Sequence, residues 1–413
     1  MSEFVETPFS RRLYLFTAFF VGASLPLMMF GRAVMQSGLA LALIGVLAIS
    51  FWHREHFTRA RKSGDAVLRT MLLITIVLWL PGLLESVDWF RSFKVWARTF
   101  VFIGVAALIW SILRKYGAAR MLALKAFVVS AVITTSLACI SVWFWPELIK
   151  VLRNMDEEVL RPNLWLKSFG ASCVCFFPVL IWAGRRLGGH WRWPAFIAAA
   201  LCVAVIFETA NRAAMAGLLA MILIGGTLLA IRDKRTRLPV LAGAPIFVAL
   251  IFFWLLNYGP TFLSPEEAYL PTILIDPHRQ MIWKFTVERG MDALWFGHGL
   301  DTINYQPGAS PSNGEHAKSL IPSHPHNWMI EVFAETGVLG LLAVIATLLK
   351  LVVGLARSVL ANNNTGVHFA LLALSVVFWT SALFNFSIWS TWWLLTYFVL
   401  FAIVSSFKDT QPD

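Results

Sequence analysis

Charged residues are scarce in this sequence. Only 14% of its 413 residues are Asp, Glu, Lys or Arg, whereas a soluble domain carries about 25%. Hydrophobic residues make up 58% of the chain, and apolar runs long enough to cross a bilayer recur along its whole length. This composition excludes a soluble enzyme, a disordered protein and a single-span anchor, and it predicts a polytopic membrane protein.

Cysteine is scarce as well, and the motifs of several cofactor sites are missing. Two of the four cysteines form C-x-C rather than the C-x-x-C of redox or zinc sites. All four lie inside apolar runs and are interpreted as small buried hydrophobic residues: Cys139, Cys173, Cys175 and Cys202. Neither H-E-x-x-H, D-x-D nor a P-loop occurs, so neither a metal nor a nucleotide or other cofactor is expected.

The formal net charge of +11 is explained by membrane topology. The cations cluster between apolar runs, as in residues 59–62 and 232–237. Such clusters are typical of cytoplasmic loops that face anionic membrane lipids. The distribution predicts that both termini are cytoplasmic, and it gives no support to nucleic-acid binding because no basic stripe interleaves with aromatic residues.

The apolar runs predict an all-α fold of about twelve transmembrane helices. These are expected near residues 13–30, 37–52, 66–84, 96–113, 122–145, 165–184, 194–208, 213–231, 238–257, 327–350, 367–385 and 392–407. The chain then divides into 1–257 with the first nine helices, a long loop at 258–326 opposite the termini, and 327–413 with the last three helices and a cytoplasmic tail. A loop of that length is usually functional.

Two arginines stand where polarity is costly in a membrane protein. Arg212 lies in the short turn between the seventh and eighth helices and begins the eighth. Arg279 lies in the first turn of a helix expected from Pro277 to about Leu294, with Asp276 as its cap. A helix N-terminus and a guanidinium together bind anions, so both positions are candidate anion sites.

The end of the long loop holds the third group of candidates. His326 directly precedes the tenth helix, on which Asn327, Glu331 and Glu335 share one face. Buried carboxylates need partners, for which Arg212 or Arg279 is the natural candidate; the alternative left open is that Glu331 and Glu335 only pack. Further residues expected to support the site are His298, His324, and the glycines Gly337 and Gly340, which allow close packing.

His326-Asn327 is followed after nine residues by Gly337 and after two more by Gly340. This spacing resembles the H-[NSQ]-x9-G-x2-G signature of bacterial O-antigen ligases, a family related to O-antigen polymerases and protein O-oligosaccharyltransferases. Arg212 and Arg279 match the positions of the family's two essential arginines, and the long loop and cytoplasmic termini agree with its topology.

The resemblance implies an inner-membrane glycosyltransferase of GT-C-like architecture whose site faces the periplasm. It implies inverting transfer of a glycan from undecaprenyl diphosphate to a sugar hydroxyl of lipid A–core oligosaccharide, without metal or ATP. His326 would be the general base, Arg212 and Arg279 would hold the diphosphate, and Asn327 would orient His326 or a sugar.

Three alternatives stay open. An O-antigen polymerase would use the same donor, but such polymerases usually have two sizeable periplasmic loops. A protein O-oligosaccharyltransferase is usually longer. A transporter of lipid-linked glycans would explain the helices and arginines without catalysis, although the sequence shows no internal repeat of the kind common in transporters.

Overall fold

The computed structural model describes residues 7–155, 161–232, 276–309, 320–321, 323–361 and 365–407, with isolated positions between 235 and 253. Within these ranges the chain is helical and contains no strand, which confirms the predicted all-α class. The helices are α1 (Pro8–Ala23), η1 (Pro26–Phe30), α2 (Arg32–Trp52), α3 (Glu55–Arg61), α4 (Ala66–Leu78), η2 (Pro81–Leu83), α5 (Trp89–Lys115), α6 (Gly117–Trp143), α7 (Glu147–Arg153), α8 (Pro162–Trp165), α9 (Lys167–Leu187), η3 (Gly189–Trp191), α10 (Arg192–Glu208), α11 (Arg212–Arg232), α13 (Pro277–Asp292), η4 (Ile303–Tyr305), α14 (Trp328–Leu360), α15 (Thr365–Ala382) and α16 (Thr391–Ser405).

Eight segments of the described chain are long and apolar enough to cross a membrane. They are Arg32–Trp52, Ala66–Leu83, Trp89–Lys115, Gly117–Trp143, Lys167–Leu187, Gly189–Glu208, Arg212–Arg232 and Trp328–Leu360. Two shorter apolar helices, Gly366–Ala382 and Thr391–Ser405, follow. The count of twelve stays a prediction, because most of the ninth expected helix, 238–257, lies outside the described residues.

The protein core surrounds α9, of whose span 78% is buried inside the protein, against 22% for α14. Helix α9 packs on α6, α10, α15 and α16, and small residues on its surface allow this close approach. At Gly170, for example, an added Cβ would lie 2.5 Å from the Thr209 hydroxyl oxygen. The four cysteines are free and buried in this core, as predicted.

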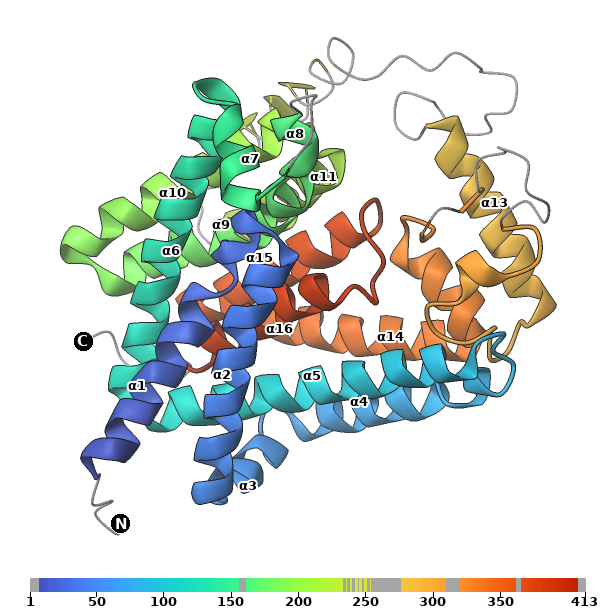
Figure 1. Ribbon diagram of the computed structural model, residues 1–413, viewed down its shortest axis with the longest axis horizontal. Helices are drawn as coiled ribbons and strands as arrows, with labels where there is room; N and C mark the ends of the chain where they lie inside the picture. Colours follow the sequence, from blue (N-terminus) through green and yellow to red (C-terminus); the bar gives the residue numbers. More distant parts are fainter. Residues whose placement is uncertain are drawn as a thin grey trace.

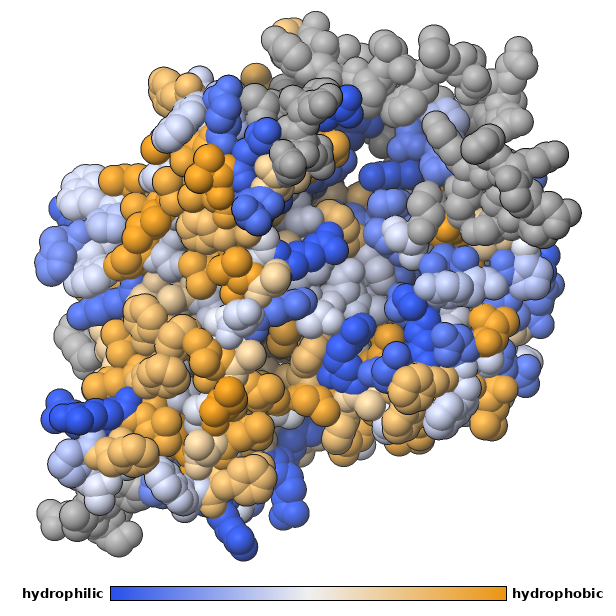
Figure 2. Space-filling model, viewed as in Figure 1, coloured by the Kyte–Doolittle hydropathy of each residue, from blue (hydrophilic) through white to orange (hydrophobic). Residues whose placement is uncertain are grey.

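Helices α4 and α14 lie side by side, and α13 packs against α14 near one end of the molecule (Figure 1). Apolar side chains cover much of the helical surface to the lower left of this view (Figure 2). Hydrophilic side chains gather around a hollow in the upper middle of the same face.

Candidate functional site

His326 is held in a fixed orientation and tautomer. Its Nδ1 lies 3.0 Å from the backbone carbonyl oxygen of Asn385, in the connection between α15 and α16. Because a carbonyl oxygen only accepts hydrogen bonds, Nδ1 carries the proton and Nε2 of the neutral ring is left as an acceptor. His326 also adopts a φ of +60°, a conformation that is uncommon for non-glycine residues and is enriched at functional sites.

The surroundings of His326 keep the imidazole neutral. Burial, followed by the positive charges of Arg279 and Lys167, lowers its pKa to about 4. The adjacent His324 has its ring centroid 4.2 Å from that of His326. Burial also lowers the pKa of His324, to about 3, together with the charges of His326, Arg279 and Arg32. Both rings are therefore neutral near pH 7 and able to accept a proton.

Arg279 lies in the first turn of α13, as predicted. Asp276 caps this helix, since its Oδ1 accepts a hydrogen bond of 2.9 Å from the Arg279 backbone N–H. The guanidinium donates from Nη1 to the carbonyl oxygen of Phe384 at 3.0 Å, and its Nε lies 3.3 Å from Asp276 Oδ2. Burial lowers the pKa of Arg279, and the Asp276 charge opposes this effect. The side chain remains charged, because arginine does not deprotonate in proteins.

Arg212 begins α11 at the short turn after α10, again as predicted. The preceding Asn211 caps the helix by accepting a hydrogen bond of 3.1 Å from the Ala214 N–H. Arg212 lies within electrostatic range of Arg279. Its Nη2 is buried and has no hydrogen-bond partner among the residues that the structure describes. A buried cationic donor of this kind requires a partner, and an anion would satisfy it.

Lys167 is a third cation at this site, and the sequence analysis missed it. It is the first residue of α9, and its backbone carbonyl accepts a hydrogen bond of 3.1 Å from Asn211 Nδ2. The charges of Arg279 and Arg212 both act on the exposed lysine side chain. Lys167 could have been found from the sequence, because it is a cation at the first position of an apolar span, as Arg212 is.

The α15–α16 connection, residues 383–390, was also missed. Its consecutive carbonyls at Phe384 and Asn385 bind Arg279 and His326. Further along, the Trp389 carbonyl accepts a hydrogen bond of 2.7 Å from Arg98 Nη2. These are backbone contacts that any residue type would make, so the sequence carries no signal for them.

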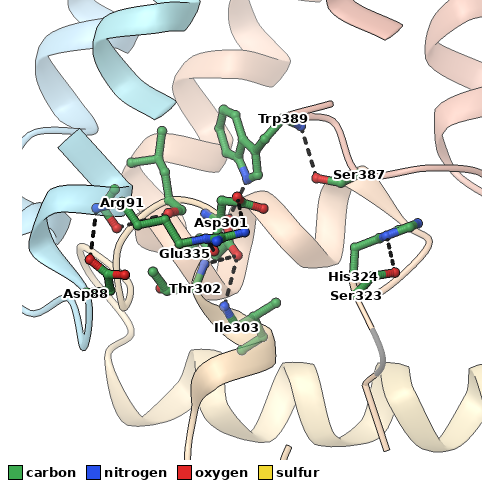
Figure 3. A network of polar contacts seen from close by, with 12 residues as sticks. Asp88, Arg91, Asp301, Thr302, Ile303, Ser323, His324, Glu335, Ser387 and Trp389 are labelled. Atoms are coloured by element: carbon green, nitrogen blue, oxygen red, sulfur yellow. Dashed lines mark hydrogen bonds and ion pairs between the residues drawn. The ribbon is translucent and has the colours of Figure 1, made fainter. Parts of the chain in front are cut away.

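The expected pairing of Glu331 and Glu335 with Arg212 or Arg279 is wrong. Glu331 accepts a hydrogen bond of 2.9 Å from the Ile388 backbone N–H. Glu335 accepts hydrogen bonds from the backbone N–H groups of Asp301, Thr302 and Ile303, at 2.7, 3.0 and 3.1 Å, and from the indole of Trp389 (Figure 3). Backbone donors satisfy both carboxylates, which therefore fasten the long loop and the α15–α16 connection to α14.

His298 and Asn327 both make structural contacts, and their expected supporting roles stay predictions. His298 Nε2 donates to the Arg289 carbonyl oxygen at 2.7 Å. Arg289 lies ten residues beyond Arg279, which is about 15 Å along α13. Asn327 Oδ1 caps α14 by accepting from the backbone N–H groups of residues 329 and 330, at 3.0 and 3.3 Å. The Asn385 carbonyl orients His326, and the expected contact of Asn327 with a sugar stays a prediction.

Gly337 and Gly340 do allow close packing, but the contact at Gly337 is with a loop. Gly337 breaks α14 with φ +70° and ψ −177°, and an added Cβ would lie 2.2 Å from the Trp295 carbonyl oxygen. Nearby, the Val338 N–H donates to the Leu294 carbonyl oxygen at 2.8 Å. At Gly340 the apolar neighbour is Trp79, 3.0 Å from an added Cβ. The motif therefore joins the long loop to α14.

Comparison with known proteins agrees with this geometry. Residues 197–345 match the family model described as O-antigen ligase. The match covers less than half of the chain. The matched region contains Arg212, Arg279 and His326, whereas Lys167 and the α15–α16 connection lie outside it.

Relatives are found among Rickettsia proteins whose curated names give polysaccharide ligase as a provisional function. The protein of Rickettsia conorii is 27% identical over 164 residues, which are 36% of this chain and 38% of the relative. That of Rickettsia prowazekii is 24% identical over 134 residues, 32% of each chain. The aligned region thus spans less than two fifths of the length of these relatives.

Proposed function

We propose that this protein is an O-antigen ligase that transfers a glycan from undecaprenyl diphosphate to a sugar hydroxyl of lipid A–core oligosaccharide. One observation carries the proposal. A neutral histidine with a free Nε2, His326, lies beside a group of cations whose described counter-ion is a single carboxylate, Asp276. The clustered positive charges repel one another, and a bound anion offsets this repulsion. A lipid diphosphate supplies the negative charge.

The helix ends support the same assignment. Lys167 and Arg212 are the first residues of α9 and α11, and Arg279 lies in the first turn of α13. Each helix N-terminus carries a partial positive charge. These dipoles add to the three side-chain charges, so the proposed diphosphate lies where cations and helix ends act together.

The reaction follows from these positions. His326 Nε2 accepts the proton of the acceptor hydroxyl as the new bond to the anomeric carbon forms. The bond from that carbon to the diphosphate oxygen breaks, and the leaving diphosphate takes the electron pair. Arg212 and Arg279 stabilise the charge that develops there. Attack opposite the leaving group inverts the anomeric centre. We place the site at the periplasmic face of the inner membrane, with both termini in the cytoplasm.

The test is a transfer assay with purified protein in nanodiscs, the lipid-linked donor and lipid A–core. His326→Ala should fold and yet lose at least about a hundredfold in rate, the usual contribution of a general base. His190→Ala, at an exposed position of η3, is the matched control. Full activity of His326→Ala would remove His326 from the role of base.

The product and the donor affinity test the remaining parts. Glycan on lipid A–core identifies a ligase, a longer lipid-linked glycan identifies a polymerase, and movement across the bilayer without transfer identifies a transporter. Arg212→Ala and Arg279→Ala should weaken donor binding. Unchanged donor affinity in both variants would contradict the diphosphate site.

A further inference from the structure

A fourth cation, Arg32, lies near the two histidines. It is the first residue of α2 and is exposed. Its guanidinium carbon lies 5.5 Å from the ring centroid of Trp392 and 5.9 Å from that of Phe386. Its Nη2 donates a long hydrogen bond of 3.3 Å to Ser168 Oγ. Within the described part of the chain no carboxylate lies at ion-pair distance from it.

The aromatic support of Arg32 is rigid. Phe386 and Trp392 pack edge to face with ring centroids 4.9 Å apart, and Trp392 is buried. A guanidinium that rests on aromatic rings by its face still presents its N–H groups at the edge. That edge forms the fork that matches a carboxylate or a phosphate. Arg32 is therefore preorganised for an anion and has none among the described residues.

The segments that hold Arg32 also build the catalytic site. Phe386 directly follows Asn385, which orients His326, and Ser168 directly follows Lys167. The Phe386 ring centroid lies 6.1 Å from that of His324. His324 Nδ1 lies 2.7 Å from Ser323 Oγ, whereas its Nε2 is buried without a partner in the described residues. A buried nitrogen without a partner beside a preorganised cation points to a polar ligand.

Ring contacts place Arg32 beside the histidine pair. Its guanidinium carbon lies 5.9 Å from the Phe386 ring centroid, which lies 6.1 Å from that of His324, and the rings of His324 and His326 are 4.2 Å apart. In an inverting displacement the base lies beside the acceptor hydroxyl. A cation next to the histidine pair is therefore placed to contact a charged group of the acceptor, and the donor KM distinguishes this from contact with the diphosphate.

We propose that Arg32, supported by Phe386 and Trp392, forms a subsite for an anionic sugar of the acceptor glycan, one that carries phosphate or carboxylate. This assignment rests on the proposed function. It makes the charge of the acceptor a determinant of specificity, since a neutral sugar leaves the guanidinium fork without a partner.

Steady-state kinetics in nanodiscs test the subsite. Arg32→Gln should raise the KM for lipid A–core about tenfold, as expected for a lost charge-assisted pair, and leave the KM for the donor unchanged. A neutral acceptor is prepared by removing the phosphates with hydrofluoric acid and reducing the sugar carboxylates to alcohols. The wild type and Arg32→Gln should have the same KM for this neutral acceptor. Arg192→Gln is the matched control, because Arg192 also stacks on a tryptophan, Trp193, at 4.9 Å.

Three results would overturn the proposal. A raised donor KM would assign Arg32 to the diphosphate site. An equal loss with charged and neutral acceptors would make Arg32 structural. If the wild type and Arg32→Gln had the same KM for lipid A–core in nanodiscs rich in phosphatidylglycerol, Arg32 would be shown to bind a lipid headgroup.

Equilibrium binding of lipid A–core keeps this proposal separate from the proposed function. If the wild type transfers no glycan, the proposed function fails. The subsite still predicts about tenfold weaker binding of the charged acceptor by Arg32→Gln and equal binding of the neutral one. Equal binding of the charged acceptor by both proteins would refute the subsite by itself.

Discussion

Arg279 and His326 are bound to adjacent carbonyl oxygens of one short connection. Arg279 Nη1 donates to Phe384 at 3.0 Å, and His326 Nδ1 donates to Asn385, also at 3.0 Å. Each peptide unit is planar, and only φ and ψ of Asn385 lie between the two carbonyls, so the connection limits how far the cation and the base can move apart. The connection is in turn held by Glu331 through the Ile388 N–H. The proposed base and the proposed diphosphate ligand are thus bound to the same short connection.

This relation makes the acidity of His326 depend on Arg279. Burial lowers the pKa of His326 to about 4, and the charge of Arg279 is the next cause. The neutral ring is the active form, so the rate falls as the pH falls through this pKa. Arg279→Gln removes a positive charge that opposes protonation. We expect the acidic limb of its remaining activity to move to higher pH, measured as kcat/KM for the acceptor from about pH 4 to about pH 8.

Arg289→Gln is the matched control for this pH profile. Arg289 lies on the same helix and pairs with Asp292 at 3.0 Å, and its charge is not among those that act on His326. Its profile should coincide with that of the wild type. If the acidic limb of the Arg279→Gln profile lay at the same pH as in the wild type, Arg279 would not affect the pKa of His326.

Lys167 should contribute to donor binding. Lys167→Gln removes one of three clustered cations and should raise the KM for the lipid-linked donor by about three- to thirtyfold, with the KM for the acceptor unchanged. Lys150→Gln, on α7, removes a lysine that has no described contact with the site. Equal donor KM values for the wild type and Lys167→Gln would exclude Lys167 from the diphosphate site.

The sequence predicted those site residues whose position depends on local signals. Arg279 follows an Asp-Pro helix start, and Arg212 begins a span after a short turn, so both were placed correctly. Phe384 and Asn385 act through backbone carbonyls, which carry no residue preference. The partner of Glu335 was predicted wrongly for the same reason, because backbone N–H groups brought near by the fold satisfy the carboxylate.

Glu335 should be a determinant of stability. Both carboxylate oxygens of Glu335 accept hydrogen bonds, from the backbone of residues 301–303 and from Trp389. In Glu335→Gln an NH2 group replaces one of these oxygens. It cannot accept a hydrogen bond, so it would face another donor and leave both unsatisfied. Leaving such buried groups unsatisfied costs about 1–3 kcal/mol each. We expect a lower midpoint of thermal unfolding in detergent. Glu85→Gln, at an exposed position, should match the wild type, and an unchanged midpoint for Glu335→Gln would contradict this account.

Gly337 should tolerate no side chain. Its φ of +70° with ψ of −177° lies in a region open only to glycine, at a cost of about 1–3 kcal/mol for other residues. An added Cβ would also meet backbone atoms of Trp295 and Phe296 at 2.2–2.3 Å, and backbone does not move aside as a flexible side chain does. Gly337→Ala should therefore separate residues 294–299 from α14.

The separation is measurable by hydrogen exchange and by activity. The Gly299 N–H donates to the Glu335 carbonyl oxygen at 3.0 Å and the Val338 N–H to the Leu294 carbonyl oxygen at 2.8 Å, so both amides should lose protection in Gly337→Ala. Gly354 lies on the same helix, and a Cβ added there would meet no neighbouring atom within 4 Å. Gly354→Ala should keep wild-type protection and gain up to about 1 kcal/mol from helix propensity. Equal protection in both variants would mean that the glycine of the motif is not required for docking the loop. Loss of protection together with loss of transfer would show that the motif positions His326 by joining the loop to α14.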